Sequence, residues 1–150
     1  MACDHEITVR PWFLTPVTGL ALLVTLVAWV VTAAADPQTA NAEPAALVLQ
    51  QLEALRAHDF VGAYALASRE LRRNFSRGEF EWMVKRAHPE IASSSSAVVV
   101  RTSASGGYVY VTVHVQGRNG HRVEALYELV HERDGWKVNA LSSRASEEAI

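Results

Sequence analysis

The spacing of apolar residues changes twice along the chain. Residues 11–35 form an apolar run that contains no charged residue. Between Val48 and the His88-Pro89 pair, apolar residues recur every three or four positions, which predicts helices. Beyond the serine run at 93–96 they alternate with polar residues, which predicts strands. The pattern therefore predicts an α+β domain that follows an N-terminal apolar segment.

The segment 11–35 is predicted to be a single transmembrane helix that acts as a signal anchor. A helix rises about 1.5 Å per residue, so this length is sufficient for a hydrocarbon core of about 30 Å. Arg10 precedes the run, and no Lys or Arg follows it until Arg56. This asymmetry favours a cytoplasmic tail at 1–10 and a domain on the other side of the membrane. The residues expected to act within the membrane, as interfacial aromatic or small packing residues, are Trp12, Gly19, Ala21, Thr25, Ala28 and Trp29.

A cleaved signal peptide is the alternative interpretation of the same segment. Small-x-small sites end at Ala35 and at Ala42. However, the tail carries Asp4 and Glu6, and the apolar run exceeds the roughly 7–15 residues of a signal core. We therefore favour a retained anchor, although both interpretations export the same domain.

Three helices are predicted for the first half of the domain, which we expect at 45–142 after a linker at 36–44. Val48, Leu52 and Leu55 share one face of the first helix. Asp59 is suited to cap the second. The pair Ser76 and Glu79 is a capping box that opens the third helix, which the His88-Pro89 pair ends. Close packing against a neighbour is expected at Gly62.

Four antiparallel strands are predicted for the second half, at 98–102, 108–116, 123–133 and 136–141, before a C-terminal tail at 143–150. The connecting turns are expected at Gly106-Gly107, Asn119-Gly120 and Asp134-Gly135. Alternation predicts that one face, with Val109, Val111, Val113, Val115, Ala125, Tyr127 and Leu129, packs on the helices. The opposite face, with Tyr108, Tyr110, Thr112 and His114, is too aromatic to be wholly solvated and is a candidate interface.

Three segments of the domain together resemble a known superfamily. They are LEALRAHDFVGAYALAS, FSRGEFEWMV and YELVHERDGWKV. In type and order they are similar to the nuclear transport factor 2-like superfamily, closest to a bacterial family of unknown function within it, over about residues 45–142. The resemblance implies a cone of three helices on a curved four-stranded sheet that often encloses a pocket and often dimerises through the sheet. It implies no particular reaction, because such folds host unrelated functions.

Composition and charge exclude several classes of function. The net charge of −2 offers no general attraction to nucleic acid. Cys3 is the single cysteine, so neither a disulfide framework nor a multi-cysteine metal site is expected. The six histidines show no spacing typical of a metal site, although His114 and His131 fall on neighbouring strands. We therefore expect no cofactor, no metal and no nucleophilic catalysis.

Two groups of residues remain as candidates for binding. Tyr64, Trp82 and Tyr127 are expected to line a pocket, with His58 and Asp59 near its rim. The simpler interpretation is that Asp59 caps a helix, and that Tyr64 and Tyr127 are core residues whose hydroxyls reach a hydrogen-bond partner. A basic cluster is expected to be either a solvated face or a contact with a partner or with lipid headgroups. It comprises Arg69, Arg72, Arg73, Arg77, Lys85 and Arg86.

These observations favour a non-catalytic accessory or structural subunit of a bacterial inner-membrane complex, with its interaction domain in the periplasm. A respiratory, photosynthetic or transport complex would fit, with other subunits and membrane lipid as partners and a homodimer through the sheet as an alternative. A different class of function is a periplasmic domain that binds a small ligand, or performs acid–base catalysis, in the cone pocket, and that is secreted after signal cleavage.

Overall fold

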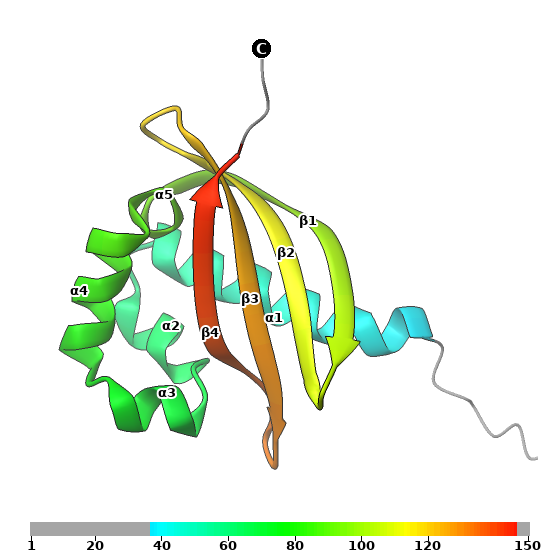
Figure 1. The fold of residues 1–150 in the computed structure, drawn as a ribbon. Coiled ribbons are helices and arrows are strands. Elements are labelled where there is room, and N and C mark those ends of the chain that lie inside the picture. The colour runs from blue at the N-terminus through cyan, green and yellow to red at the C-terminus, as the bar shows by residue number, and fades with distance from the viewer. Residues whose placement is uncertain (1–36, 147–150) are drawn as a thin grey trace, which may run out of the picture. The chain divides into compact units, whose positions relative to one another are not determined.

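Five helical segments precede the sheet in the computed structural model, which describes residues 37–146 (Figure 1). They are α1 (Pro37–Arg56), α2 (Phe60–Ala65), α3 (Arg69–Asn74), α4 (Arg77–Ala87) and α5 (Pro89–Ala92). The three predicted helices correspond to α1, α2 and α4. The other two, α3 and α5, are six and four residues long. Segments this short show too little of the helical period to be separated from their neighbours by pattern alone.

The prediction of a linker at 36–44 is wrong for its described part, because α1 begins at Pro37. Proline is favoured in the first turn of a helix, where its missing N–H is not needed. Pro44 lies inside α1, where proline normally costs a hydrogen bond. Its side chain is fully buried, however, so packing compensates for that loss.

Side-chain caps fix where α2 and α4 begin, as predicted. The Asp59 carboxylate accepts a hydrogen bond of 2.8 Å from the Gly62 N–H. The Ser76–Glu79 capping box is complete, and its hydrogen bonds lower the pKa of the Glu79 carboxyl. A Cβ atom at Gly62 would lie 2.3 Å from Asp59 Oδ2. The close neighbour expected at Gly62 is therefore the capping residue of its own helix.

The sheet is an antiparallel meander in the order β1-β2-β3-β4, as predicted. Its strands are β1 (Ser94–Ser105), β2 (Tyr108–Gly117), β3 (Arg122–Glu132) and β4 (Gly135–Ala145). Both outer strands are longer than predicted, because their ends are polar and lack the alternation that marks a strand. Gly106, Gly107, Gly120 and Gly135 take positive φ values of 59°, 85°, 85° and 110° in the turns.

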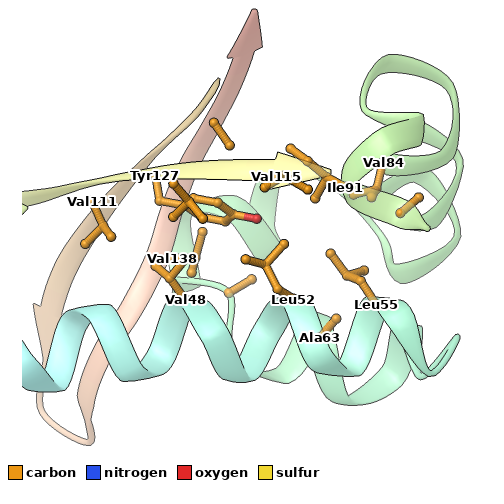
Figure 2. Close-up of a cluster of buried hydrophobic side chains, with 14 of the residues drawn as sticks. Val48, Leu52, Leu55, Ala63, Val84, Ile91, Val111, Val115, Tyr127 and Val138 are labelled. Carbon is orange, nitrogen blue, oxygen red and sulfur yellow. The ribbon is translucent and has the colours of Figure 1, made fainter. Parts of the chain in front are cut away.

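The core lies between α1 and one face of the sheet (Figure 2). Val48, Leu52 and Leu55 of α1 are each at most 1% exposed. The predicted inner face is confirmed, since its four valines on β2 and its three residues on β3 are all buried. The helices α2, α3 and α4 lie to the side of β4 (Figure 1), whereas α5 packs against β2, with Ile91 beside Val115 (Figure 2).

The helical half is joined to the edge of β4 by a short parallel bridge. The Ser68 N–H donates to the Val138 carbonyl at 2.8 Å, and the Val138 N–H donates to the Leu66 carbonyl at 3.0 Å. This connection covers the β4 edge over a short stretch and holds α3 close to that strand. It thereby determines the position of a cleft between the two.

The predicted transmembrane segment and tail lie outside the described residues, together with Trp12, Gly19, Ala21, Thr25, Ala28 and Trp29. Among residues 37–146, no helix has the length and apolarity needed to cross a bilayer.

Candidate functional site

The three residues predicted to line a pocket do not come together. Trp82 is 65% exposed on α4, where the Arg86 guanidinium lies 5.8 Å from its ring centre. The Tyr64 hydroxyl donates to the Phe75 carbonyl at 2.7 Å, as expected for a core tyrosine with a partner. Tyr127 is fully buried, and its hydroxyl has no hydrogen-bond partner among the described residues. The predicted pocket is therefore wrong. Trp82 lies two positions after Phe80, so the helical period places it on the opposite side of α4 from the buried Phe80 and Val84.

A cleft of about 400 Å³ lies instead between β4 and the helices α1, α3 and α4. We call it the cleft, and its volume is within the range of small-molecule sites. Most of its lining is apolar. The apolar lining residues are Leu55, Leu71, Phe75, Phe80, Met83, Val84, Val138, Ala140 and Leu141.

The polar groups of the cleft are Gln51, Glu70, Asn74 and Asn139. The Gln51 side chain is buried and donates to the Ala63 carbonyl at 3.0 Å. The Asn139 amide donates to Glu128 at 2.9 Å and accepts from the Ser68 hydroxyl at 2.7 Å. Glu70 is thus the one charged residue among the described residues that line the cleft. Such a wall suits binding of a neutral molecule better than acid–base chemistry.

His58 and Asp59, expected at the rim of a pocket, do not line the cleft. Asp59 serves as the cap of α2, and His58 takes a positive φ of 59° in the turn before it. Both residues are therefore explained by the connection between α1 and α2.

Sequence reasoning missed the cleft because it did not separate α3 as a helix of its own. Leu71 within α3 and Phe75 at its C-terminal cap both line the cleft. The available signal was Ser68 itself, a good N-cap residue three positions before a leucine. The Ser68 hydroxyl does accept from the Leu71 N–H at 3.0 Å.

The basic cluster is partly neutralised by neighbouring groups. Arg69 pairs with Glu132 at 3.2 Å, and Lys85 pairs with Glu81 at 2.6 Å. The Lys85 ammonium also lies 4.6 Å from the centre of the Phe60 ring. The cluster is spread over α3 and α4, and all of its members except Arg72 are exposed. It is therefore a mixed, solvated surface in which Arg73 and Arg77 make no ion pair within the described residues.

The helix-free face of the sheet, which we call the outer sheet face, carries the predicted interface residues. Tyr108, Tyr110 and His114 are half-buried there, and Thr112 is 7% exposed beneath its neighbours. Thr112 lies between Arg101 of β1 and Leu126 of β3. Val98 and Leu126, which lie opposite His114 and Thr112, are exposed apolar residues of this face, at 64% and 41% exposure. Val100 is 52% exposed at the irregularity of β1 between Val99 and Arg101. Arg101, Thr112 and Leu126 are among the residues that line a hollow of about 470 Å³ on this face.

Charges on the outer sheet face are largely paired with one another. Arg144 donates twice to the Glu124 carboxylate, at 2.6 and 3.1 Å, and His114 lies 3.6 Å from the same group. These hydrogen bonds, with that of Arg144 contributing most, lower the pKa of the Glu124 carboxyl. Desolvation and the neighbouring Glu128 raise the pKa of the Tyr110 hydroxyl. Arg101, by contrast, makes no ion pair within the described residues.

No group of three potential metal ligands occurs within the part of the chain that the structure describes. His114 lies opposite Glu124, and His131 lies opposite Trp136, with the two ring centres 5.0 Å apart. The two histidines on neighbouring strands are therefore engaged separately.

Comparison with known proteins identifies the family of the domain. No curated protein matches the chain. A family described as a domain of unknown function, DUF4864, matches residues 37–149. This match covers the whole described domain, from α1 to the end of β4. The chain therefore belongs to the DUF4864 family of domains of unknown function.

Proposed function

We propose that the protein is a non-catalytic accessory or structural subunit of a larger bacterial membrane complex, and that the outer sheet face binds another subunit. The observation that carries this proposal is the exposure of Val98 and Leu126 on a face that no described helix covers. Exposed apolar residues grouped on one surface are typical of interaction sites.

The character of the outer sheet face supports binding of a protein. Its apolar residues are flanked by Glu124 and Arg144, which neutralise each other. Such a pair costs less to bury than two separate charges. Arg101 remains available, so we infer that the partner subunit places a carboxylate opposite it. A second copy of the chain would offer Arg101 to the same surface, which makes a different subunit the better fit.

Anchoring at the inner membrane is part of the proposal and is supported by the apolar run at 11–35. With Arg10 on the cytoplasmic side, the domain would lie in the periplasm. Cleavage at Ala35 or Ala42 would instead release it as a secreted protein.

We also infer that the domain is of the nuclear transport factor 2-like type. The support is the order of its elements, with helices before a four-stranded antiparallel meander, together with the motif LEALRAHDFVGAYALAS in α1 and α2. In this interpretation the cleft beside β4 corresponds to the mouth of the cone.

The basic cluster is proposed to contact another subunit or lipid headgroups. Arg73 and Arg77 support this proposal, because they are exposed and make no ion pair within the described residues.

Native separation of mild-detergent membrane extracts tests the proposal, with intact mass read on the chain from the resolved band. We expect the full-length wild type to migrate inside a large assembly. The double variant Val98→Lys/Leu126→Lys should leave that assembly. The matched control is Leu49→Lys/Val61→Lys, which changes residues 41% and 58% exposed on α1 and α2.

Three outcomes would contradict the proposal. The first is a chain shortened by 35 or 42 residues that runs alone in the soluble fraction. The second is an assembly that contains only copies of this chain, which would indicate a homodimer through the sheet. The third is loss of the control variant from the assembly together with the Val98→Lys/Leu126→Lys variant.

A further inference from the structure

Trp82 is 65% exposed, which is the highest exposed fraction among the large apolar side chains of residues 37–146. It lies on the side of α4 opposite the buried Phe80 and Val84. A single exposed apolar residue is ordinary on a protein surface and by itself indicates no function. The groups that surround the Trp82 ring, however, give it a specific character.

The neighbours of Trp82 on α4 are small or charged. Residues three and four positions apart lie beside each other on a helix, and here they are Gly78, Glu79, Lys85 and Arg86. A Cβ atom at Gly78 would meet nothing within 4 Å, so the space on that side of the ring is open. On the other side, the Arg86 guanidinium lies 5.8 Å from the ring centre. The ring therefore stands among charged groups and is not part of an apolar patch on this helix.

The surface around Trp82 carries an excess of positive charge. Residues 69–88 contain six Arg or Lys and three Glu, an excess of three positive charges. Glu79 completes the cap of α4, Glu81 pairs with Lys85 at 2.6 Å, and Glu70 lines the cleft. The exposed cations of this stretch that make no ion pair within the described residues are Arg73, Arg77 and Arg86. Charge complementarity therefore requires an anionic surface opposite α4.

An anionic lipid surface fits this arrangement better than an acidic protein does. In protein interfaces, an aromatic residue that contributes strongly lies in a well-packed pocket whose rim excludes water. Trp82 has no such apolar surround on α4. Tryptophan is enriched at membrane interfaces, where the ring contacts apolar chains and the N–H remains near water. The unpaired cations are distributed over α3 and α4, which matches the distributed charge of anionic headgroups.

We propose that the outward face of α4 docks on an anionic lipid surface, with the Trp82 ring among the headgroups and with Arg77 and Arg86 near the lipid phosphates. A helix that combines tryptophan with cations has the composition of an interfacial contact. The proposal rests on the anchoring at the inner membrane proposed above, which would keep the domain close to that surface. It does not depend on the outer sheet face. Docking of α4 would fix the orientation of the domain relative to the bilayer.

Nitrobenzoxadiazole, a fluorophore that brightens in apolar surroundings, tests the proposal on the full chain reconstituted in vesicles. It is attached at Gly78→Cys in a Cys3→Ser background, so the reporter lies one turn from Trp82 and replaces no side chain of the proposed contact. The matched control carries the label at Val98→Cys, because Val98 is 64% exposed on the outer sheet face. One set of vesicles contains phosphatidylcholine and phosphatidylglycerol in equal parts, and the other contains phosphatidylcholine alone.

We expect the reporter at position 78 to be brighter in the anionic vesicles than in phosphatidylcholine, and the reporter at position 98 to be equally bright in both. In the position 78 background, Trp82→Ala should remove most of this difference.

Removal of charge should weaken docking as well. Arg77→Gln/Arg86→Gln should lower the ratio of docked to free domains about thirtyfold, since each cation near an anionic surface contributes about fivefold. The matched control is Arg101→Gln/Arg118→Gln, which removes two exposed cations outside the helices and should change the signal little. All of these side chains are exposed, so the melting temperatures of the variants should stay close to that of the reporter protein.

Two results in vesicles would overturn the proposal. The first is equal brightness at position 78 in the two kinds of vesicle, or an equal response at positions 78 and 98. The second is a response that Trp82→Ala leaves unchanged.

Native separation of membrane extracts supplies the third contrary result. Loss of Trp82→Ala from the large assembly would show that α4 contacts a protein subunit instead of lipid. Failure of the proposed subunit function is distinguishable, because it concerns the Val98→Lys/Leu126→Lys variant or a shortened chain in those extracts. The vesicles contain no other subunit and hold the full chain, so neither outcome changes their signal.

Discussion

The Ser68 hydroxyl donates a hydrogen bond of 2.7 Å to the side-chain oxygen of Asn139, 71 positions later in the chain. The same hydroxyl accepts from the Leu71 N–H and so caps α3. Ser68 is fully buried. One side chain thus sets both the start of α3 and its distance from β4, and these two elements form opposite sides of the cleft.

Ser68→Ala should therefore destabilise the protein more than the loss of an ordinary cap. We expect a decrease of about 2 kcal/mol in the free energy of unfolding, because a cap and a buried hydrogen bond are lost together. Ser76→Ala is the matched control, since Ser76 caps the exposed start of α4. Denaturant unfolding of both variants measures the difference. Equal losses would show that the Ser68–Asn139 bond adds nothing to stability.

Gly62 and Asp59 should show strong coupling in a double-mutant cycle. Gly→Ala in a helix usually stabilises by about 1 kcal/mol. At Gly62 the new Cβ would displace the Asp59 carboxylate from its capping position, so the gain should be cancelled. In an Asp59→Ala background the cap is already absent, and Gly62→Ala should then stabilise by about 1 kcal/mol. Additive effects in thermal or denaturant unfolding would contradict this interpretation.

The two faces of α1 should respond differently to truncation. Leu52 is 1% exposed and packs beneath the sheet, whereas Leu49 is 41% exposed. Leu52→Ala should lower the free energy of unfolding by about 2–5 kcal/mol, because it leaves a cavity in the core. Leu49→Ala should have a much smaller effect. A similar loss in both variants, measured by denaturant unfolding, would mean that the outward face of α1 is also covered in solution.

The order of elements and the buried face of the sheet were predictable because they rest on long periodic patterns. In β2 the valines alternate with other residues, which indicates both a strand and its buried face. In α1 the spacing of Val48, Leu52 and Leu55 indicates both a helix and its buried face. Ser76 with Glu79, and Asp59, were predictable as caps because their hydrogen bonds are local in the sequence.

The cleft was not predictable in the same way, because its walls come from elements far apart in the chain. Leu71 and Leu141 line one cleft only because α3 is joined to β4, and no local pattern in the sequence predicts that connection. The alternation of apolar and polar residues in β3 correctly predicted that Tyr127 is buried. No sequence pattern shows, however, that its hydroxyl lacks a hydrogen-bond partner among the described residues.

His88 should make the stability of the domain depend on pH. Its ring lies half-buried between α4 and α5, and Nδ1 is hydrogen-bonded to the Ser143 hydroxyl of β4 at 2.7 Å. Burial lowers the pKa of His88 below its usual value of 6.5, and the nearby Glu90 opposes this shift only in part. The folded state therefore binds a proton at His88 less readily than the unfolded state does. It follows that the contribution of His88 is fully present above about pH 6.5 and decreases as the pH falls below that value.

Melting temperatures between pH 7.5 and pH 5 measure this dependence, and we expect the wild type to lose stability over the lower half of that range. His88→Gln cannot be protonated and should flatten the profile, while its stability at pH 7.5 reports the lost packing. His121→Gln is the matched control, because the side chain of His121 is 76% exposed. If His88→Gln retained the wild-type slope between pH 7.5 and pH 5, the pH dependence would have to come from groups other than His88.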